Sequence, residues 1–398
     1  MAQKKSLLFI GHTYHLKTKS SDFIQDMFAK KYDITRFYFD PHSDDVSVYK
    51  ELDGKTFDVV VLWQIMPSLN TLKKYIHFQR CIFFPMYDYY IFQGGAFSPL
   101  WAEYTDVQTV CFSKSIYNDL TNAGFSARYI QYFPKPLSVN NMGRLDSVFF
   151  WQRTNEINIR SVETVLKNTH LNHVHFHKAL DPSHQFIEPS EQWQGMISYS
   201  SWYDKKEDML KDVQKSALYI APRIYEGIGM SFLEAMSMGR CVIAHDDATM
   251  NEYIEHGKTG FLCDFKNPQP LTIHHVRQIQ KNTLQFIQEG YARWEKEKKN
   301  ILTWAEEELT VDTEKIQSHL AKLSKKRKQE NAPMTTRYRF YFLGLRVFEI
   351  KSNPLKQVYY VCKIPLLKVK QKKSRYKKSY HLFGCIPLLT VKKRSYKC

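Results

Sequence analysis

The stretch from residue 219 to residue 262 constrains the fold more than any other part of the chain. Residues 218–220 form an apolar strand pattern, and the Glu-Gly-Ile-Gly turn at 226–229 follows it. Residues 231–238 carry apolar side chains at helical spacing up to a stop at Gly239, and residues 241–244 form a second strand pattern. A strand, a helix and a strand in this order are joined most simply in a parallel sheet, so we expect an α/β, doubly wound fold.

The junction between this turn and its helix predicts a binding site. A helix N-terminus offers unpaired backbone N–H groups, here those of Ile228, Gly229, Met230 and Ser231, and glycines at 227 and 229 let a ligand approach them. Such a site suits a diphosphate. Glu226 and Glu234 flank it, and carboxylates accept strong hydrogen bonds from hydroxyl groups rather than from phosphates. Backbone N–H groups that donate to phosphate, beside carboxylates that accept from hydroxyl groups, predict a pocket for a nucleotide sugar.

The same residues resemble the E-x7-E signature of retaining glycosyltransferases with the GT-B fold, the GT4-like group, of the bacterial surface-polysaccharide type. The resemblance covers E-G-I-G, L-E-A-M, G-x-x-V-I and E-x-x-x-x-G-x-T-G-F-L in register, over about forty residues. It implies two Rossmann-like domains that face a cleft. It also implies that Glu226 contacts the donor sugar, that Glu234 binds the ribose, and that transfer retains the anomeric configuration.

A purely structural reading of the two carboxylates stays open at this point. Ser231-x-x-Glu234 is also a capping-box pattern, in which Glu234 would bond the backbone of its own helix. Glu226 could likewise be a solvated loop residue.

Three arginines are candidates to balance the charge of a diphosphate. Arg153 follows the apolar strand pattern at 147–151, where the resemblance implies an arginine with a catalytic role. Arg160 departs from the family in spacing and residue type, and Arg223 directly precedes the turn at 226–229. The alternative for each is a surface ion pair of little energetic value.

Three further residues complete the predicted site. Gly11 and His12 end the first strand pattern, at 6–11, where a doubly wound domain places a ligand-facing loop. His12 is assigned a catalytic role, although a structural role fits it as well. Trp202 could stack on the nucleobase or pack at the rim.

We expect no metal and no cofactor beyond the sugar nucleotide itself. His173, His175 and His177 alternate along one strand, but such a trio rarely shares one ion. Asp246-Asp247 lacks the spacing of a metal-binding D-x-D motif and is interpreted as a turn.

The 398 residues are divided into an acceptor-side domain (1–136), a nucleotide-sugar domain (137–330) and a basic tail (331–398), with the first boundary at the Pro-Lys-Pro link at 134–136. Seven cysteines without paired spacing fit a reducing compartment. No signal peptide or membrane-spanning run is predicted. We therefore expect a cytoplasmic protein, peripheral on the inner face of the cell membrane.

The tail holds 17 Lys/Arg and one acid, so it accounts for +16 of the net charge of +17. Three imperfect copies of one unit, at 340–351, 359–370 and 381–393, predict short strands or hairpins. Aromatic and basic residues interleaved in sequence suit an anionic membrane surface, which we favour over nucleic acid.

The sequence as a whole predicts a glycosyltransferase that moves a hexose-type sugar from a nucleotide-diphosphate donor to a glycan or lipid-linked acceptor, in cell-surface polysaccharide or lipopolysaccharide synthesis. Two alternatives remain. One is a sugar-nucleotide epimerase or phosphorylase on the same architecture, and the other is a non-catalytic membrane- or nucleic-acid-binding protein.

Overall fold

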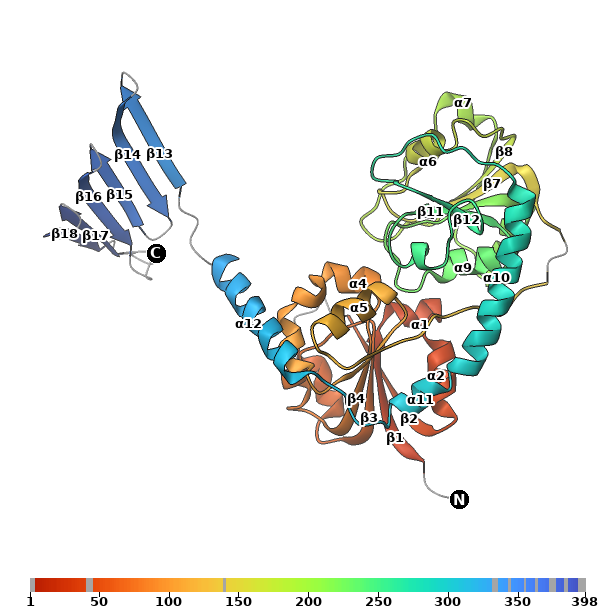
Figure 1. Ribbon diagram of the computed structural model, residues 1–398, viewed down its shortest axis with the longest axis horizontal. Coiled ribbons are helices and arrows are strands. Elements are labelled where there is room, and N and C mark those ends of the chain that lie inside the picture. Colours follow the sequence, from red (N-terminus) through yellow and green to blue (C-terminus); the bar gives the residue numbers. More distant parts are fainter. Residues whose placement is uncertain are drawn as a thin grey trace, which may run out of the picture. The chain divides into compact units, whose positions relative to one another are not determined.

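The computed structural model describes residues 4–40, 46–138 and 141–330, together with six strand segments between residues 336 and 392. Contacts divide the chain into two compact units, Met1–Leu320 and Ala321–Cys398, and each is described by itself. Figure 1 colours the strands of three six-stranded sheets red to orange, yellow to green, and blue.

The first sheet is entirely parallel and has the order β2-β1-β3-β4-β5-β6. Its strands are β1 (Lys5–His12), β2 (Tyr32–Phe39), β3 (Thr56–Trp63), β4 (His77–Phe84), β5 (Gln108–Cys111) and β6 (Ala127–Tyr129). The helical segments between them are α1 (Tyr14–Thr18), α2 (Asp22–Ala29), η1 (Val46–Leu52), α3 (Leu69–Leu72), α4 (Tyr87–Phe92), η2 (Gly95–Phe97), η3 (Pro99–Glu103) and α5 (Lys114–Asn122). The central strands are apolar and buried along most of their length, as expected of a sheet covered on both faces.

The second sheet is also parallel, with the order β12-β11-β10-β7-β8-β9. Its strands are β7 (Arg144–Gln152), β8 (His173–Lys178), β9 (Ile197–Ser200), β10 (Ser216–Ile220), β11 (Cys241–His245) and β12 (Gly260–Cys263). Its helical segments are α6 (Ile159–Val165), α7 (Glu191–Gln194), α8 (Lys206–Lys215), α9 (Met230–Ser237) and η4 (Met250–Glu252). The predicted α/β architecture with two doubly wound sheets is confirmed.

The chain then returns to the first sheet through α10 (Val276–Glu297), α11 (Asn300–Trp304) and α12 (Thr313–Glu330). Trp294 of α10 meets the ring of Phe23 at 5.9 Å, and Glu306 accepts hydrogen bonds from Lys5 and Tyr32. α12 begins only at Thr313, and the preceding Glu306 and Glu307 bond residues of the first sheet.

The third sheet is antiparallel and lies in the tail, with strands in sequence order. Its strands are β13 (Thr336–Phe342), β14 (Leu345–Asn353), β15 (Lys356–Val361), β16 (Ile364–Gln371), β17 (Lys377–Leu382) and β18 (Ile386–Lys392). The predicted repeats are therefore strands. The central bend positions of the three units, residues 344, 363 and 385, lie outside the described residues. No helix among the described residues is long and apolar enough to cross a membrane.

Candidate functional site

Charged side chains gather where the strands of the second sheet end. Arg153 follows β7, Asp181 follows β8, and Arg223 and Glu226 follow β10. Since β10, β7 and β8 are neighbours in one parallel sheet, their carboxyl ends meet at one edge. Ligands of open α/β sheets bind at this edge.

The turn before α9 approaches the first domain so closely that residue 227 must be glycine. A Cβ at Gly227 would lie 2.8 Å from the Cβ of Met86 and 3.2 Å from Oδ1 of Asp88. Gly229 has φ of 81°, a conformation that favours glycine, and a Cβ there would lie 1.9 Å from the ring of Phe232. These glycines put the start of α9 next to Asp88.

The start of α9 keeps free hydrogen-bond donors. Within the described part of the chain, no backbone acceptor is found for the N–H groups of residues 227–231. The helix begins at Met230 with Gly229 as its N-cap residue, which gives no side-chain cap. Because Ser231 is the second helical residue and not the cap, the capping-box alternative is wrong.

Glu226 is buried without a full set of partners. The residue is 7% exposed, and its Oε1 has no hydrogen-bond partner among the residues that the structure describes. Burial raises the pKa of this carboxyl above its usual value, and the nearby Arg223 and Arg153 oppose that shift. The reading of Glu226 as a solvated loop residue is therefore wrong. A buried acceptor left unpaired costs stability, and such groups mark sites that a ligand completes.

Ser231 adds a second unpaired atom at the same helix start. Its Oγ is buried and has no hydrogen-bond partner of acceptable geometry. It nevertheless lies close enough to the Tyr219 hydroxyl to counteract slightly the rise in the pKa of Tyr219, which is caused mainly by burial. Two oxygens of different chemistry are thus available beside the free N–H groups.

Two of the three candidate arginines converge on one carboxylate, which the sequence analysis did not single out. Arg153 donates from Nε and Nη2 to Oδ1 of Asp181, at 3.1 and 2.9 Å. Arg223 donates to the other oxygen, Oδ2, from Nε at 3.1 Å and also from Nη2. Burial alone would raise the pKa of Asp181, but the two guanidinium groups together lower it. Asp181 could have been found from the sequence, because it too follows a predicted strand.

Arg223 also reaches the first domain. Its Nη1 lies 3.4 Å from Oδ2 of Asp88, at the start of α4. Burial raises the pKa of Asp88, and Arg223 opposes the rise. Asp88 was not among the site residues that the sequence analysis predicted.

Arg160 does not join this cluster through any bond found among the described residues. It lies in the first turn of α6, where its Nη1 is 3.3 Å from Oε2 of Glu163, and its side chain is 51% exposed. This is the surface ion pair that the sequence analysis left open.

Glu234 faces a lysine. It lies one turn into α9, largely buried, and pairs with Lys206 at the start of α8. Burial raises the pKa of Glu234, while Lys206 lowers it. Trp202, just before α8, is 50% exposed, and Nζ of Lys17 from the first domain sits 4.0 Å from its ring centroid. Trp202 is thus a half-exposed ring with a lysine over it, and Glu234 is a largely buried carboxylate with a lysine as its partner.

His12 and Gly11 end β1, as predicted. Nδ1 of His12 accepts a hydrogen bond of 2.9 Å from the backbone N–H of Tyr14, and Nε2 lies 3.8 Å from Asp40. Gly11 packs against Tyr38, whose ring would lie 3.2 Å from an added Cβ. These contacts place both residues at the carboxyl edge of the first sheet.

Direct bonds join the two domains near this cluster. Glu252 of η4 accepts from the backbone N–H groups of Lys114 and Ser115, at 2.7 and 3.3 Å, and thereby caps helix α5 of the first domain. Tyr87 donates to Oδ1 of Asp247 at 3.1 Å. The sequence analysis missed the role of Glu252, since no local pattern reveals a cap supplied by another domain.

The histidines of β8 are held by serines. His175 and His177 both hydrogen-bond Oγ of Ser200, at 2.8 and 2.9 Å. Burial lowers the pKa of His177 to about 4. No group of three His, Cys, Asp or Glu side chains arranged for a metal ion is found among the described residues.

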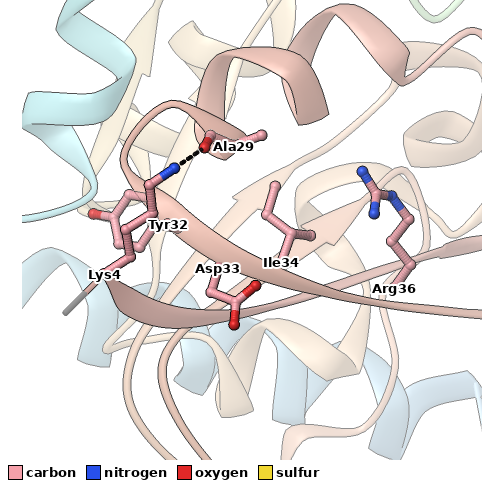
Figure 2. Close-up of a pocket in the computed structure, with 6 residues that line it drawn as sticks. All are labelled: Lys4, Ala29, Tyr32, Asp33, Ile34 and Arg36. Atoms are coloured by element: carbon pink, nitrogen blue, oxygen red, sulfur yellow. Dashed lines mark hydrogen bonds between the residues drawn. The ribbon is translucent and has the colours of Figure 1, made fainter.

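A hollow lies elsewhere, beside the edge strand β2. It has a volume of about 470 Å³. Figure 2 shows Lys4, Ala29, Tyr32, Asp33, Ile34 and Arg36 around it. Nζ of Lys4 donates to the carbonyl of Ala29 at 2.7 Å, and Nε of Arg36 donates to Gln25 at 2.8 Å. Because the residues that line this hollow lie toward the amino ends of β1 and β2 and include no buried unpaired atom, we do not assign it the chemistry.

Comparison with known families finds one match within the chain. Residues 194–300 match the model of glycosyl transferases group 1, a segment that includes the turn at 226–229, α9 and Glu252. No curated protein sequence matches the chain.

Comparison with solved structures gives the fold. Sucrose-phosphate synthase from Thermosynechococcus elongatus aligns with a TM-score of 0.53 at 11% identity, over 82% of this chain and 100% of the other. Anabaena HepE in complex with UDP and glucose aligns at 0.43 and 12%, over 81% and 100%. S. aureus TarM aligns at 0.37 and 15%, over 67% of this chain and 55% of TarM.

The fold is GT-B. Together with the matched segment, it supports a glycosyltransferase. The chain spans only about half the length of TarM. The match begins in α7 and ends in α11, so it contains Trp202, Arg223, Glu226 and Glu234 but neither Arg153 nor the first domain.

Proposed function

We propose that the protein transfers a hexose-type sugar from a nucleotide-diphosphate donor to a glycan or lipid-linked acceptor, with retention of configuration. The observation that carries the proposal is Oε1 of Glu226, a buried acceptor without a partner beside unpaired backbone N–H groups. A sugar hydroxyl would complete the carboxylate, and phosphate oxygens would complete the N–H groups.

Each part of the donor has a candidate partner. Glu226 would accept from a hydroxyl of the sugar, and Glu234 from the ribose, after Lys206 moves aside. Trp202 would stack on the base where Lys17 now lies. The backbone at residues 228–231 would hold the diphosphate, with Ile228 buried in the core to fix the turn and Met230 at the first helical position.

Arg153 and Arg223 would stabilise the departing diphosphate. Asp181 accepts hydrogen bonds from both guanidinium groups, so an arriving phosphate would compete with this carboxylate for them. Fixed positive groups aimed at developing negative charge lower the barrier to leaving-group departure. We assign no metal to this step.

The acceptor would enter from the first domain. Asp88, His12 and Gly11 lie at the carboxyl edge of its sheet, and Asp88 contacts Arg223 across the domain boundary. Because Glu252 and Asp247 also bond the first domain, these bonds would hold the domains together during transfer. His12 would act on the acceptor hydroxyl, and Arg160 would have at most a minor role in donor binding.

Two experiments separate this proposal from its alternatives. Purified protein with a panel of UDP-, GDP-, ADP- and CMP-sugars should show a raised melting temperature for one donor class, since ligand binding stabilises the native state. Product analysis with and without acceptor then distinguishes transfer from epimerisation or phosphorolysis. The anomeric configuration of the product, read by NMR, tests retention. Inversion would overturn that part of the proposal.

We also propose that the tail, residues 331–398, brings the enzyme to an anionic membrane surface during synthesis of cell-surface polysaccharide or lipopolysaccharide. The support is the charge of +16 in that segment, with each basic residue near such a surface contributing about 1 kcal/mol. Deletion of residues 331–398 should abolish binding to vesicles that contain anionic lipid and leave donor binding intact. Equal vesicle binding without the tail would contradict the proposal.

A further inference from the structure

The strand register of the tail sorts its residues by chemistry. Residues opposite each other in an antiparallel pair lie on one face of the sheet, and neighbours along a strand alternate between faces. Tyr338 pairs with Ile350, Ile350 with Tyr359, and Tyr359 with Leu367. These four positions on four successive strands therefore share a face.

Extending this register over all six strands gives two faces of opposite character. The first face carries mostly apolar and aromatic residues, with the polar residues Thr336, Ser352, Gln357 and Gln371 and one charged residue, Lys378. Its apolar positions are Tyr338, Phe340, Phe342, Leu345, Phe348, Ile350, Tyr359, Val361, Ile364, Leu367, Val369, Tyr380, Leu382, Ile386, Leu389 and Val391. The second face carries one acid, Glu349, uncharged residues that include Tyr341, Val358 and Tyr360, and nine basic positions. These are Arg337, Arg339, Arg346, Lys351, Lys356, Lys368, Lys370, Lys377 and Lys392.

The separation is kept by a bulge that recurs in every repeat. The register shifts once in each of the three hairpins, and the residues that it skips are Val347, Leu366 and Leu388. Each skipped residue holds the same place in its repeat. Without the skip, the second strand of each hairpin would change faces, because a shift of one residue reverses a strand.

A face of this kind needs a cover. Among the described residues of the unit from Ala321 to Cys398, no second sheet lies on it, since all six strands belong to one layer. Sheets bury their apolar face against another layer. The cover must therefore come from outside this sheet.

We propose that the apolar face, defined by the sixteen positions above, packs against the same face of a second copy of this chain. Six strands at about 4.8 Å spacing and seven residues at about 3.3 Å give roughly 650 Å² per face. Two such faces bury roughly 1,300 Å², which lies within the range of specific, stable interfaces. An apolar face matches itself, as a two-fold interface requires.

The charge pattern limits the assembly to two copies. In the pair, both outer faces are basic, so a third layer would meet like charge. The pattern also disfavours lipid as the cover of the apolar face. A membrane there would leave the nine basic positions on the far face, about one Debye length away, where their attraction to lipid headgroups is weak. In the dimer, the outer basic faces stay available for an anionic surface.

Two neighbouring positions provide a matched test. Tyr359 lies on the apolar face and Val358 on the basic face of the same strand, β15. Tyr359→Lys and Val358→Lys add the same charge one residue apart. The mass of the full chain is measured by light scattering during size-exclusion chromatography and by sedimentation equilibrium over a range of concentrations.

We expect wild-type protein and Val358→Lys to have twice the chain mass of 47.2 kDa, and Tyr359→Lys to have the monomer mass. A monomeric wild-type chain, or a dimer that tolerates lysine at both positions, would overturn the proposal. Loss of binding to neutral phosphatidylcholine vesicles in Tyr359→Lys, with wild type monomeric, would instead assign the face to lipid.

A second pair of variants shows whether a monomer results from misfolding of the sheet. Leu367→Lys should give a monomer like Tyr359→Lys, and Lys368→Ala, next to it on the other face, should stay dimeric. Hydrogen exchange over residues 336–392 reports whether the sheet persists in each variant. A monomer whose sheet remains protected supports the proposal. If both lysine variants lose protection, the mass of wild type is compared with the mass of the chain that lacks residues 331–398. A dimer formed through another surface would survive this deletion and would overturn the proposal.

Discussion

The hollow beside β2 and the turn before α9 both carry charged side chains, but they differ in how completely those side chains are hydrogen-bonded. In the hollow, Lys4 and Arg36 already have partners in exposed surroundings. The turn before α9 holds Glu226, which is buried and has an oxygen without a partner. The volume of a cavity shows where a ligand could fit, whereas a buried unpaired group shows where one is needed.

The largest effect should come from Glu226. Glu226→Gln should lower the transfer rate about 100-fold or more, because the amide loses the charge that a sugar hydroxyl meets in the transition state. Initial rates with the donor found in the thermal-shift screen provide the measurement. Glu255→Gln, an exposed change in the same domain, should leave the rate unchanged. Equal rates for Glu226→Gln and Glu255→Gln would contradict the assignment of the site to the turn before α9.

Asp181 should have an effect of opposite sign on binding. Asp181→Asn frees Arg153 and Arg223 from a competing carboxylate, so the dissociation constant of the nucleoside diphosphate should fall several-fold. Titration calorimetry with the nucleotide and with inorganic diphosphate measures it. Asp146→Asn, which removes a carboxylate paired with exposed Arg144, is the control. Weaker binding in Asp181→Asn would mean that this carboxylate orients the arginines and does not compete for them.

The burial of Glu226 also predicts that the stability of the protein depends on pH. Burial raises the pKa of Glu226 in the folded protein, so the folded state holds this proton more tightly than the unfolded state does. The carboxyl therefore costs stability at pH values above its unfolded pKa of about 4.3, and the cost reaches its full size above the raised folded pKa. Glu226→Gln should melt higher than wild type at pH 8, by about 2–4 °C for each kcal/mol relieved.

This advantage should shrink as the pH falls toward 4, where both states of wild-type protein bind the proton. Melting curves of both proteins between pH 5 and pH 8 check the trend. A variant that melts lower than wild type at pH 8 would show that Glu226 stabilises the fold, and the turn would then lose its claim to be a site.

The smallest effect should come from the hollow. Arg36→Ala removes a charged wall of this cavity, and donor affinity and transfer rate should both change less than about twofold, as surface substitutions usually do. A loss of activity comparable with that of Glu226→Gln would show that the hollow, and not the turn before α9 alone, takes part in the reaction.

The sequence predicted most of the framework and the turn before α9, since apolar runs and paired glycines are local signals. It also predicted Arg153, Arg223, Glu226 and Glu234 as site residues, and those predictions stay untested. The partners of these residues were not predictable from local patterns. Asp181 and Asp88 meet Arg223 only after three strands from two sheets are aligned. Lys206 pairs with Glu234 across 28 positions of sequence, and nothing in either segment specifies that pairing.

The tail illustrates a different gap. Its sequence interleaves basic and aromatic residues, and from that mixture we expected an anionic membrane surface as the partner. The strand register places most of the basic residues on one face and most of the apolar and aromatic residues on the other, although Tyr341 and Tyr360 lie on the basic face. Alternation along a strand carries this information, but the bulge in each repeat shifts it by one residue, and only the pairing shows where.

The central claim is that Glu226 binds the sugar and Glu234 binds the nucleoside of one sugar-nucleotide donor. Calorimetric titration of wild type, Glu226→Gln and Glu234→Gln, each with the sugar nucleotide and with the bare nucleoside diphosphate, tests it most directly. Glu234→Gln should weaken both ligands by about tenfold or more, and Glu226→Gln should weaken the sugar nucleotide alone. Wild-type affinity of Glu226→Gln for the sugar nucleotide, or an equal loss for both ligands, would contradict the account.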